Sequence, residues 1–481
     1  MLTDALRDCM LAELPFEPTE QQVGAMTHLA TFLLSSDDGI FVLRGYAGTG
    51  KTSLIAALVR TLNVLHRPVV LMAPTGRAAK VFAAYSGCPA YTIHKVIYRQ
   101  KKFEGEYSEF TLGFNKLRHA LFVIDEASMI ANQGGGWLGT QNLLDDLLRF
   151  VAEGEGCRVL FVGDTAQLPP VGEDVSPALS VSCLKGYSPR VSEFELTQVV
   201  RQAVESGVLW NATVLRQLLT TEAERVFPYI RGWGFSDVVF LSGADLIETL
   251  EGAYQKVGVE DTIVVTRSNK RAIVYNNGIR GRIFDREGEL VQGERVMVAK
   301  NNYFWIEQFA KSNPEENVPI DFVANGDTAE VRRVRNVHEQ YGFCFADVLL
   351  RFPDYNDFEM EFRVLLDTLQ SEAPALLREQ SERLYQSVLL DYMDIPQKRE
   401  RMKRLREDPY YNALQLKYAY AVTCHKAQGG QWRNVFIDQG YITEEMYNLS
   451  YLRWLYTAFT RATEKLYLVN WPETQRMLPQ E

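Results

Sequence analysis

Cysteine is scarce in this sequence, and so is every pattern that would tie it to a structural role. The 481-residue chain holds six cysteines and six histidines, with no C-x-x-C pair and no His/Cys cluster at zinc-binding spacing. These absences favour a reduced, cytoplasmic setting over a disulfide or zinc scaffold. No apolar run approaches the length of a membrane-spanning helix, and charge breaks up Met1–Asp8 in a way that is not typical of a secretory signal.

A strongly basic composition is also missing. The formal net charge is −10, which argues against a protein that binds polyanions over its whole surface. It does not exclude a local cationic groove, because net charge describes the entire molecule whereas DNA is held locally. No internal repeat or low-complexity tract stands out, and the length predicts about three or four domains.

What is present is a complete nucleotide-binding motif. Gly45–Thr52 fills every position of the pattern G-x-x-x-x-G-K-S/T, between a run typical of a buried strand, Ile40–Leu43, and one typical of a packed helix, Ser53–Val59. Its glycines allow successive backbone N–H groups to point at a phosphate, Lys51 adds a cation, and Thr52 offers a hydroxyl to Mg²⁺. The motif predicts a nucleoside triphosphate site with these residues: Gly45, Ala47, Gly48, Thr49, Gly50, Lys51, Thr52 and Ser53.

Short apolar runs alternate with helix-like stretches in two parts of the chain, which predicts an α/β fold with parallel sheets. The first part, residues 38–205, has expected strands at Ile40–Leu43, Val69–Met72, Leu121–Ile124 and Arg158–Val162. The second begins near residue 237 with a strand and a helix at Thr262–Thr266 and Arg271–Ile279. It is expected to resume with strands at Tyr418–Val422, Val435–Ile437 and Leu466–Val469.

Three segments interrupt the alternation. Tyr98–Leu117 is polar and aromatic and predicts a small hairpin. Residues 291–370 have turns and no long helical pattern, which predicts a small β-barrel with strands at Arg295–Val298, Thr328–Val334, Ala346–Phe352 and Glu359–Val364. Residues 371–408 predict one or two charged helices, in which the run Lys398–Arg406 is more typical of a solvated helix face than of a nucleic-acid contact.

Several polar residues follow expected strands, where the carboxyl edge of a parallel sheet faces a ligand. Asp125 is predicted to hold Mg²⁺ opposite Thr52, and Glu126 to orient and deprotonate the attacking water. Gln167 could hydrogen-bond the γ-phosphate or the attacking water, or it could simply belong to a surface loop that ends in proline. Arg201 and Arg461 are candidates to stabilise the charge of phosphoryl transfer, although an isolated arginine is more often a surface or salt-bridge residue.

The order of these blocks resembles that of superfamily 1B DNA helicases, particularly the RecD-like and phage Dda-like group. Thr19–Gln22 is similar to the family's glutamine motif, so the resemblance implies that Gln22 recognises adenine. Gly163–Gln167 resembles the coupling motif with its γ-phosphate-sensing glutamine, and Arg201 and Arg461 match the two arginine-finger positions. Thr423–Gly429 looks like the motif that joins ATP to DNA, with Gly429 on the nucleotide side.

The resemblance implies two RecA-like motor domains with ATP held between them. The first would comprise residues 1–97 and 119–205, and the second residues 206–290 and 409–481. The hairpin at 98–118 lies where the family carries its strand-separating pin, with Phe103, Tyr107 and Phe110 as wedge candidates or packing residues. Residues 291–370 lie where it carries an SH3-like domain, while the helices at 371–408 have no firm counterpart.

The implied substrates are single-stranded DNA and single/double-strand junctions. The resemblance implies a monomeric motor that moves along the strand in the 5′-to-3′ direction and works with replication or recombination proteins. A strand held without sequence readout needs polar contacts to its backbone. Ala73–Ala79 and Thr92–Lys95 resemble the strand-contacting motifs of the first motor domain, and Thr266–Lys270 follows a strand of the second. The candidate DNA contacts are Pro74, Thr75, Gly76, Arg77, Thr92, His94, Thr266, Asn269, Thr423 and His425. His94 and His425 could equally well stabilise their own loops.

Three other functions use part of the same set of residues. A translocase that strips proteins from DNA would carry the same motifs with little unwinding. A nucleotide kinase also needs a phosphate loop, Mg²⁺ and arginines, but not Thr423–Gly429. A non-enzymatic, ATP-gated DNA-binding subunit would not need Glu126, Gln167, Arg201 and Arg461 together.

Overall fold

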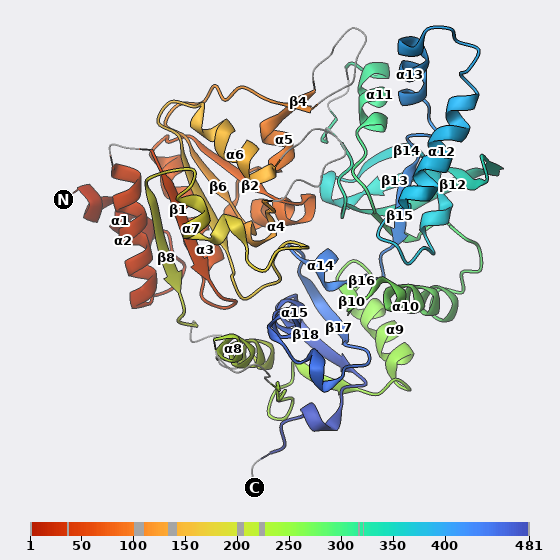
Figure 1. Ribbon diagram of the computed structural model, residues 1–481. Helices are drawn as coiled ribbons and strands as arrows, with labels where there is room; N and C mark the ends of the chain where they lie inside the picture. The colour runs from red at the N-terminus through yellow and green to blue at the C-terminus, as the bar shows by residue number, and fades with distance from the viewer. Residues whose placement is uncertain are drawn as a thin grey trace.

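The computed structural model describes residues 2–35, 38–100, 110–132, 142–199, 206–220, 227–315, 318–320 and 322–479. Two parallel sheets and a β-barrel make up its framework (Figure 1). Apolar runs form the central sheet strands because these strands are covered on both faces, so few of their residues are polar. The α/β class with parallel sheets that the sequence predicted is therefore what the chain adopts, with a closed barrel beside it.

The first sheet has six parallel strands in the order β3-β2-β6-β7-β1-β8. Their bounds are β1 Ile40–Gly45, β2 Val69–Ala73, β3 Ala90–Thr92, β6 Leu121–Ile124, β7 Arg158–Gly163 and β8 Val191–Leu196. The helices around it are α1 Leu2–Ala12, α2 Glu20–Leu34, α3 Lys51–Val64, α4 Gly76–Ser86, α5 Ile93–Ile97, α6 Leu143–Ala152 and α7 Val181–Leu184. One apolar core fills the space between the sheet and α1–α3, and a second lies between the sheet and α6.

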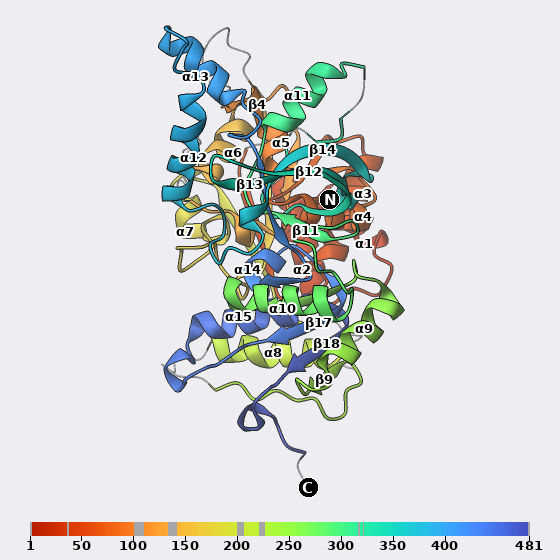
Figure 2. The same cartoon turned by 90° about the vertical axis from the view of Figure 1, so that its right-hand side faces the viewer.

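The second sheet has five parallel strands in the order β16-β10-β17-β18-β9. Their bounds are β9 Val238–Leu241, β10 Thr262–Thr266, β16 Ala421–Thr423, β17 Trp432–Asp438 and β18 Ala462–Val469. Its helices are α8 Gly207–Leu219, α9 Leu246–Val257, α10 Asn269–Arg282, α14 Cys424–Ala427 and α15 Leu449–Phe459. In Figures 1 and 2 this sheet lies below the first one and on the side of the C-terminus.

The barrel closes through five strands in the order β11-β12-β13-β14-β15. They are β11 Arg295–Val298, β12 Thr328–Gln340, β13 Phe343–Phe352, β14 Phe358–Leu365 and β15 Leu414–Tyr418. The barrel interior and one face of the second sheet belong to a single apolar cluster, joined through residues such as Tyr275 on α10 and Tyr420. This shared core ties the barrel to the second sheet. Its SH3-like character stays a prediction.

The structure corrects two details of the sequence interpretation. Tyr418–Val422, expected to be one strand of the second sheet, is divided: β15 ends in the barrel at Tyr418 and β16 begins in the sheet at Ala421. The segment with no predicted helix contains α11, Phe304–Ser312.

Residues 371–408 form two helices, within the one or two that the sequence predicted. They are α12 Arg378–Leu390 and α13 Lys398–Arg406, which pack through Leu384, Val388 and Leu405 on Phe343 and Phe345.

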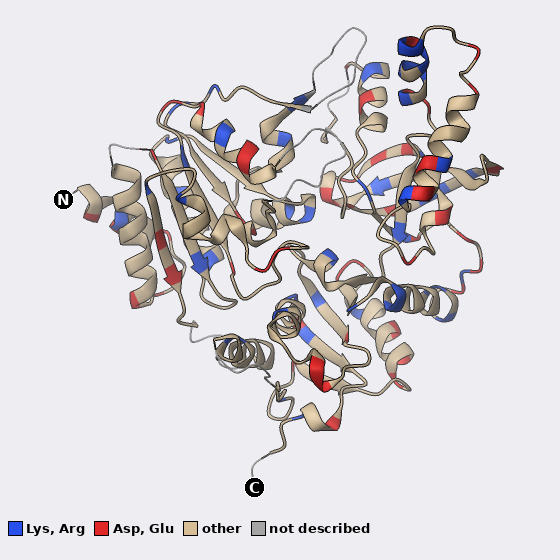
Figure 3. Cartoon of the chain, in the orientation of Figure 1, with Lys and Arg blue, Asp and Glu red and all other residues tan. Residues whose placement is uncertain are grey.

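The predicted hairpin is present at its base, where β4 Tyr98–Gln100 pairs antiparallel with β5 Phe110–Leu112. Two of its wedge candidates, Phe103 and Tyr107, lie outside the described residues, as does the side chain of Phe110. The Lys and Arg residues of the basic run on α13 are visible at the upper right of Figure 3. Among the described residues, no helix combines the length and the apolar character needed to cross a bilayer.

Candidate functional site

The phosphate loop lies between β1 and α3, at the carboxyl edge of the first sheet. Gly48 and Gly50 have φ angles of +76° and +81°, which an L side chain rarely adopts. A Cβ on Gly45 would lie 2.9 Å from Thr49 Oγ1, so this glycine is required for space. The Lys51 ammonium donates hydrogen bonds to the carbonyls of Gly45 and Tyr46, the latter at 2.9 Å. The Lys51 ammonium is therefore hydrogen-bonded by carbonyls of its own loop, while Thr52 is exposed at the start of α3.

Gln22 is fully buried beneath this loop. It closes a capping box at the start of α2, in which its Oε1 accepts from Thr19 N at 3.0 Å. Its Nε2 donates to the carbonyl of Thr49 at 3.1 Å. Both ends of the amide are thus engaged inside the protein, and Gln22 ties α2 to the phosphate loop. Its predicted contact with adenine stays a prediction.

Asp125 and Glu126 follow β6 on the neighbouring side of the loop. Asp125 accepts hydrogen bonds from Tyr85 Oη and, at 2.8 Å, from Glu126 N. Burial, and then the nearby Glu126 carboxylate, raise the pKa of Asp125 to about 6. Glu126 has a φ of +50°, which turns the chain sharply after the strand. One hydroxyl and one or two carboxylates is a donor set that suits Mg²⁺, which keeps much of its water.

Asp164 and Gln167 come from the segment after β7. Asp164 is buried, and burial raises the pKa of its carboxyl. Its oxygens accept from Ala166 N at 2.9 Å and from Tyr456 Oη at 2.6 Å. Gln167 is 7% exposed, and its Oε1 is buried without a hydrogen-bond partner in the described structure. A buried amide oxygen of this kind is available to a ligand or water.

The second sheet reaches this cleft through α15. Arg461, just after that helix, is 3% exposed and donates to the carbonyls of Thr457 and Gly430 at 3.1 and 3.2 Å. Its Nη1 lies 3.8 Å from Glu126 Oε1. The arginine, from the side of the second sheet, therefore faces the predicted catalytic carboxylate, which follows a strand of the first. The structure thus brings Arg461 to the phosphate-loop side, as the sequence predicted for a finger. Arg201 lies outside the described residues.

Two further contacts join the sheets where the sequence predicted DNA binding. The Arg77 guanidinium lies 4.1 Å above the Trp432 ring and donates to the carbonyl of Gln431 at 3.1 Å. Burial lowers the pKa of Arg77 to about 10, which leaves it charged at neutral pH. Gly429 approaches closely as well, because a Cβ there would lie 3.0 Å from that of Ala78. Arg77 of the first sheet therefore contacts the segment before β17 of the second, and Gly429 of the second approaches α4 of the first.

The other strand-contacting candidates of the first sheet cap short helices. Thr75 accepts from Ala78 N at 3.2 Å and Thr92 from Lys95 N at 3.3 Å, so both hydroxyls begin a helix. Gly76 faces the barrel, since a Cβ there would clash with Tyr355 Oη. His94 packs against Tyr98 and Phe322, and burial lowers its pKa to about 4. Pro74 lies between β2 and this group.

Candidates from the second sheet line a shared cavity of about 350 Å³ between α10, β16 and the barrel. Asn269, Thr423 and His425 contribute to its wall, whereas Thr266 is buried and donates to Ser268 O at 3.1 Å. Sequence reasoning missed the cations of this wall, which are Arg267, Lys417 and Lys426. Burial lowers the pKa of both lysines to about 8. Lys417 lies in β15 and belongs to no motif, whereas Arg267 and Lys426 lie within Thr266–Lys270 and Thr423–Gly429 without having been singled out there.

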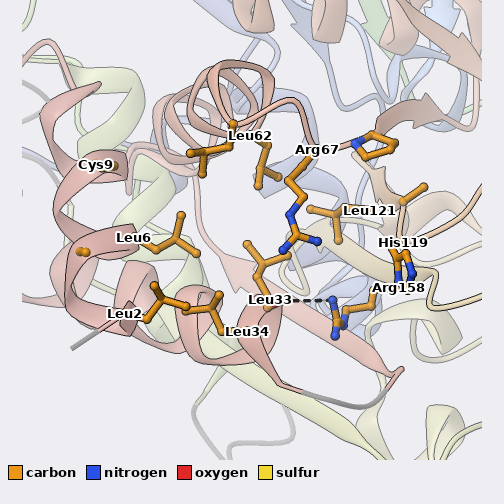
Figure 4. A pocket seen from close by; sticks show the side chains of 14 residues that line it. Leu2, Leu6, Cys9, Leu33, Leu34, Leu62, Arg67, His119, Leu121 and Arg158 are labelled. Atoms are coloured by element: carbon orange, nitrogen blue, oxygen red, sulfur yellow. Dashed lines mark hydrogen bonds between the residues drawn. The ribbon is translucent and has the colours of Figure 1, made fainter.

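A second cavity, of about 230 Å³, lies at the opposite edge of the first sheet. Figure 4 shows leucines of α1 and α2 on one side and Arg67, His119 and Arg158 on the other. Arg158 donates to the carbonyl of Leu33 at 3.1 Å. Leu121 and Arg158 begin β6 and β7, whereas the phosphate loop follows the end of β1. The cavity contains none of the predicted site residues.

Two family models match the chain. One, described as an AAA domain, covers residues 18–227, and the other, described as a UvrD-like helicase C-terminal domain, covers residues 418–469. The first span contains the phosphate loop and Asp125–Glu126. The second contains Thr423–Gly429 and Arg461. The two models therefore cover the two sides of the cleft.

Curated relatives agree with these models. The chain is 32% identical to the ATP-dependent RecD2 DNA helicase of Deinococcus radiodurans over 300 residues, which are 59% of this chain and 36% of that protein. It is 24% identical to the ATP-dependent DNA helicase dda of Enterobacteria phage T4 over 275 residues, 53% of this chain and 55% of that protein. An uncharacterised protein of Acanthamoeba polyphaga mimivirus is 22% identical over 93% of this chain and 98% of its own. The chain thus spans about a third of the Deinococcus helicase and about half of the phage helicase.

Among solved structures, a Pif1 helicase from Bacteroides in complex with ADP-AlF3 and ssDNA aligns with 97% of this chain and 95% of that chain. The sequence identity is 16% and the TM-score 0.46.

Proposed function

We propose that the chain is a superfamily 1B helicase, of the family of the RecD-like and Dda-like proteins, and that it couples ATP hydrolysis to movement along single-stranded DNA and to duplex unwinding. The observation that carries this proposal is the composite cleft. α15 of the second sheet places Arg461 within 3.8 Å of Glu126, beside the phosphate loop of the first. A site divided between two domains changes when the domains close, which is how hydrolysis is coupled to motion.

We assign the first motor to residues 1–97 and 119–205 and the second to residues 206–290 and 419–481. We assign residues 98–118 to the predicted pin-like insertion. The barrel comprises residues 291–370 and β15, with the helices of residues 371–408 inserted before β15. Moving β15 from the second motor into the barrel follows from its pairing with β11 and β14.

At the phosphate loop, Lys51 and the N–H groups of Gly45–Thr52 would bind the triphosphate. Thr52 and Asp125 would hold Mg²⁺, which neutralises phosphate charge when bound. Glu126 would orient and deprotonate the attacking water. Burial and the adjacent Glu126 carboxylate raise the pKa of Asp125, and a cation at this position would offset both effects. Ala47, Gly48, Thr49, Gly50 and Ser53 would complete the cradle.

Gln167 would orient the attacking water, because its unpartnered Oε1 can accept a hydrogen bond from that water, and its Nε2 would donate to the γ-phosphate. Arg461 would stabilise the charge that develops on the transferred phosphoryl group, and Arg201 would do so at the junction between the motors. Gln22 would act at the adenine and Gly429 on the nucleotide side of the second motor, as the family resemblance implies.

Single-stranded DNA would run from the cavity of the second sheet to the helix starts of the first. Asn269, Thr423 and His425, with the cations of the same wall, would contact the backbone in the second motor. Thr75, Thr92 and the backbone near Gly76 would do so in the first. Polar and cationic contacts without base readout are the mode that a translocating motor needs.

Partial duplexes with either a 5′ or a 3′ single-stranded overhang test this function directly. ATP-dependent strand separation is expected only from the 5′ overhang, and Lys51→Ala is the matched control without activity. Unwinding that requires a 3′ overhang would contradict the proposed 5′-to-3′ direction but would still support an ATP-driven motor. ATP-driven displacement of a protein from single-stranded DNA, without unwinding of either duplex, would favour a translocase.

A further inference from the structure

A single tyrosine hydroxyl joins the phosphate loop, the coupling segment and the second motor. Tyr456 lies on α15 and is 1% exposed. Its Oη accepts a hydrogen bond from Ala47 N at 2.8 Å, and its O–H donates to Asp164 Oδ2 at 2.6 Å. Ala47 belongs to the phosphate loop and Asp164 follows β7, so one side chain of the second motor bonds two catalytic segments of the first.

The next residue of the same helix, Thr457, continues these contacts. Thr457 Oγ1 accepts from Leu168 N at 2.9 Å, one residue after Gln167. The carbonyl of Thr457 in turn accepts from Arg461 Nε at 3.1 Å. The position of Arg461 is therefore set by the same helix turn that the first motor holds through Tyr456.

We propose that Tyr456 is a positioning residue, whose hydroxyl fixes α15 against the phosphate loop and Asp164 and thereby places Arg461 for hydrolysis. This inference rests on the proposed ATPase function. The hydrogen bond to Asp164 is buried and charge-assisted, which makes it among the stronger kinds, and the one from Ala47 N is partly buried. Tyr456 does not touch the reacting atoms; it acts through Arg461.

The same geometry predicts which kinetic constant changes. Tyr456 accepts from the Ala47 N–H, a donor of the phosphate loop, so removing the hydroxyl frees that donor and is not expected to weaken ATP binding. Arg461 acts where charge develops during transfer, so its misplacement lowers kcat. A purely structural role would change stability and leave this division between kcat and KM unaffected.

Tyr456→Phe is the test, because phenylalanine keeps the packed ring and removes only the hydroxyl. Tyr451→Phe is a matched control on the same helix: Tyr451 is 2% exposed, and its O–H donates to Gln439 Oε1 at 2.6 Å, away from the phosphate loop. Both purified variants are compared with the wild type for thermal unfolding, for KM of ATP and for kcat with saturating single-stranded DNA.

Both variants are expected to lose similar stability. Only Tyr456→Phe should lower the DNA-stimulated kcat, by about 10- to 100-fold, with KM for ATP changed by less than about threefold. Asp164→Asn provides a second approach should Tyr456→Phe fold poorly: it should lower kcat similarly, and the double variant should lose little more than either single one.

Equal kcat values for Tyr456→Phe and Tyr451→Phe would overturn the inference, and so would a change confined to KM. Multiplicative losses in the double variant would overturn the link through Asp164. A wild-type protein without DNA-dependent hydrolysis would overturn the proposed function and this inference with it. An active wild type with an unaffected Tyr456→Phe would overturn the inference alone.

Discussion

Replacement of Asp327 by asparagine is expected to stabilise the protein above neutral pH and to have little effect under acidic conditions. Asp327 is 3% exposed and lies where the barrel meets the first motor, next to Gly76. Its carboxylate accepts from Ala324 N at 2.7 Å and from Tyr355 Oη at 2.9 Å. Burial nevertheless outweighs these bonds and raises its pKa from the ordinary 3.8 to about 7.

The sign of the pH dependence follows from this raised pKa. Between 3.8 and about 7 the folded protein binds a proton that the unfolded chain has released, so stability falls as pH rises and levels off above about 7. At about 1.4 kcal/mol per pKa unit, the ionised carboxylate costs at most roughly 4 kcal/mol. Asparagine removes that cost and loses one of two hydrogen bonds, worth about 1 kcal/mol. The net gain at alkaline pH is about 1–3 kcal/mol.

Thermal unfolding of wild type and Asp327→Asn at pH 5 and pH 8 measures this difference. The variant should unfold several degrees higher at pH 8 and at nearly the same temperature at pH 5. Asp347→Asn is the barrel control, because Asp347 is paired with Arg363 at 2.9 Å and its loss should destabilise at both pH values. An Asp327→Asn difference that does not depend on pH would refute the reasoning.

Three further predictions concern the motor. Lys51→Ala should lower DNA-stimulated ATP hydrolysis, measured by phosphate release, by about 100-fold or more. Its affinity for single-stranded DNA, measured by fluorescence anisotropy, should be largely retained, and a loss of strand binding would contradict the separation of the two sites. Glu126→Gln should lower hydrolysis by about 10²- to 10⁴-fold and retain ATP binding, as single-turnover kinetics would report; unaltered turnover would exclude it as the base. Lys417→Gln with Lys426→Gln should weaken strand binding and make its salt dependence shallower by up to about 1.4 in log–log slope. The exposed pair Lys185 and Lys256, replaced likewise, is the control and should leave the slope unchanged.

Local patterns predicted the parts of the fold that local chemistry determines. The runs at β1, β6 and β7 are apolar throughout because each strand is covered on both faces, so their positions could be deduced from sequence. The division of Tyr418–Val422 between barrel and sheet could not, because Tyr418 and Ala421 are both buried and differ only in their partner strands. Strand pairing over such sequence separations leaves no local signal.

The candidate site shows the same limit. Gly45–Thr52 and Asp125–Glu126 were identified from spacing, since phosphate and cation chemistry needs those residue types in order. Tyr456 lies in the apolar run of α15 and resembles an ordinary core residue until its hydroxyl is placed between Ala47 and Asp164. Arg77 matched a strand-contacting motif, whereas its guanidinium stacks on Trp432 of the other sheet. Side-chain direction across an interface depends on tertiary structure.

The rate of ATP hydrolysis with and without single-stranded DNA tests the central claim most directly. The composite cleft and the cationic cavity predict that hydrolysis is slow alone and rises by at least about tenfold with single-stranded DNA, and that Arg461→Ala abolishes the stimulated rate. A rate that is indifferent to DNA, with phosphate transferred instead to a nucleotide acceptor, would contradict the account and identify a kinase.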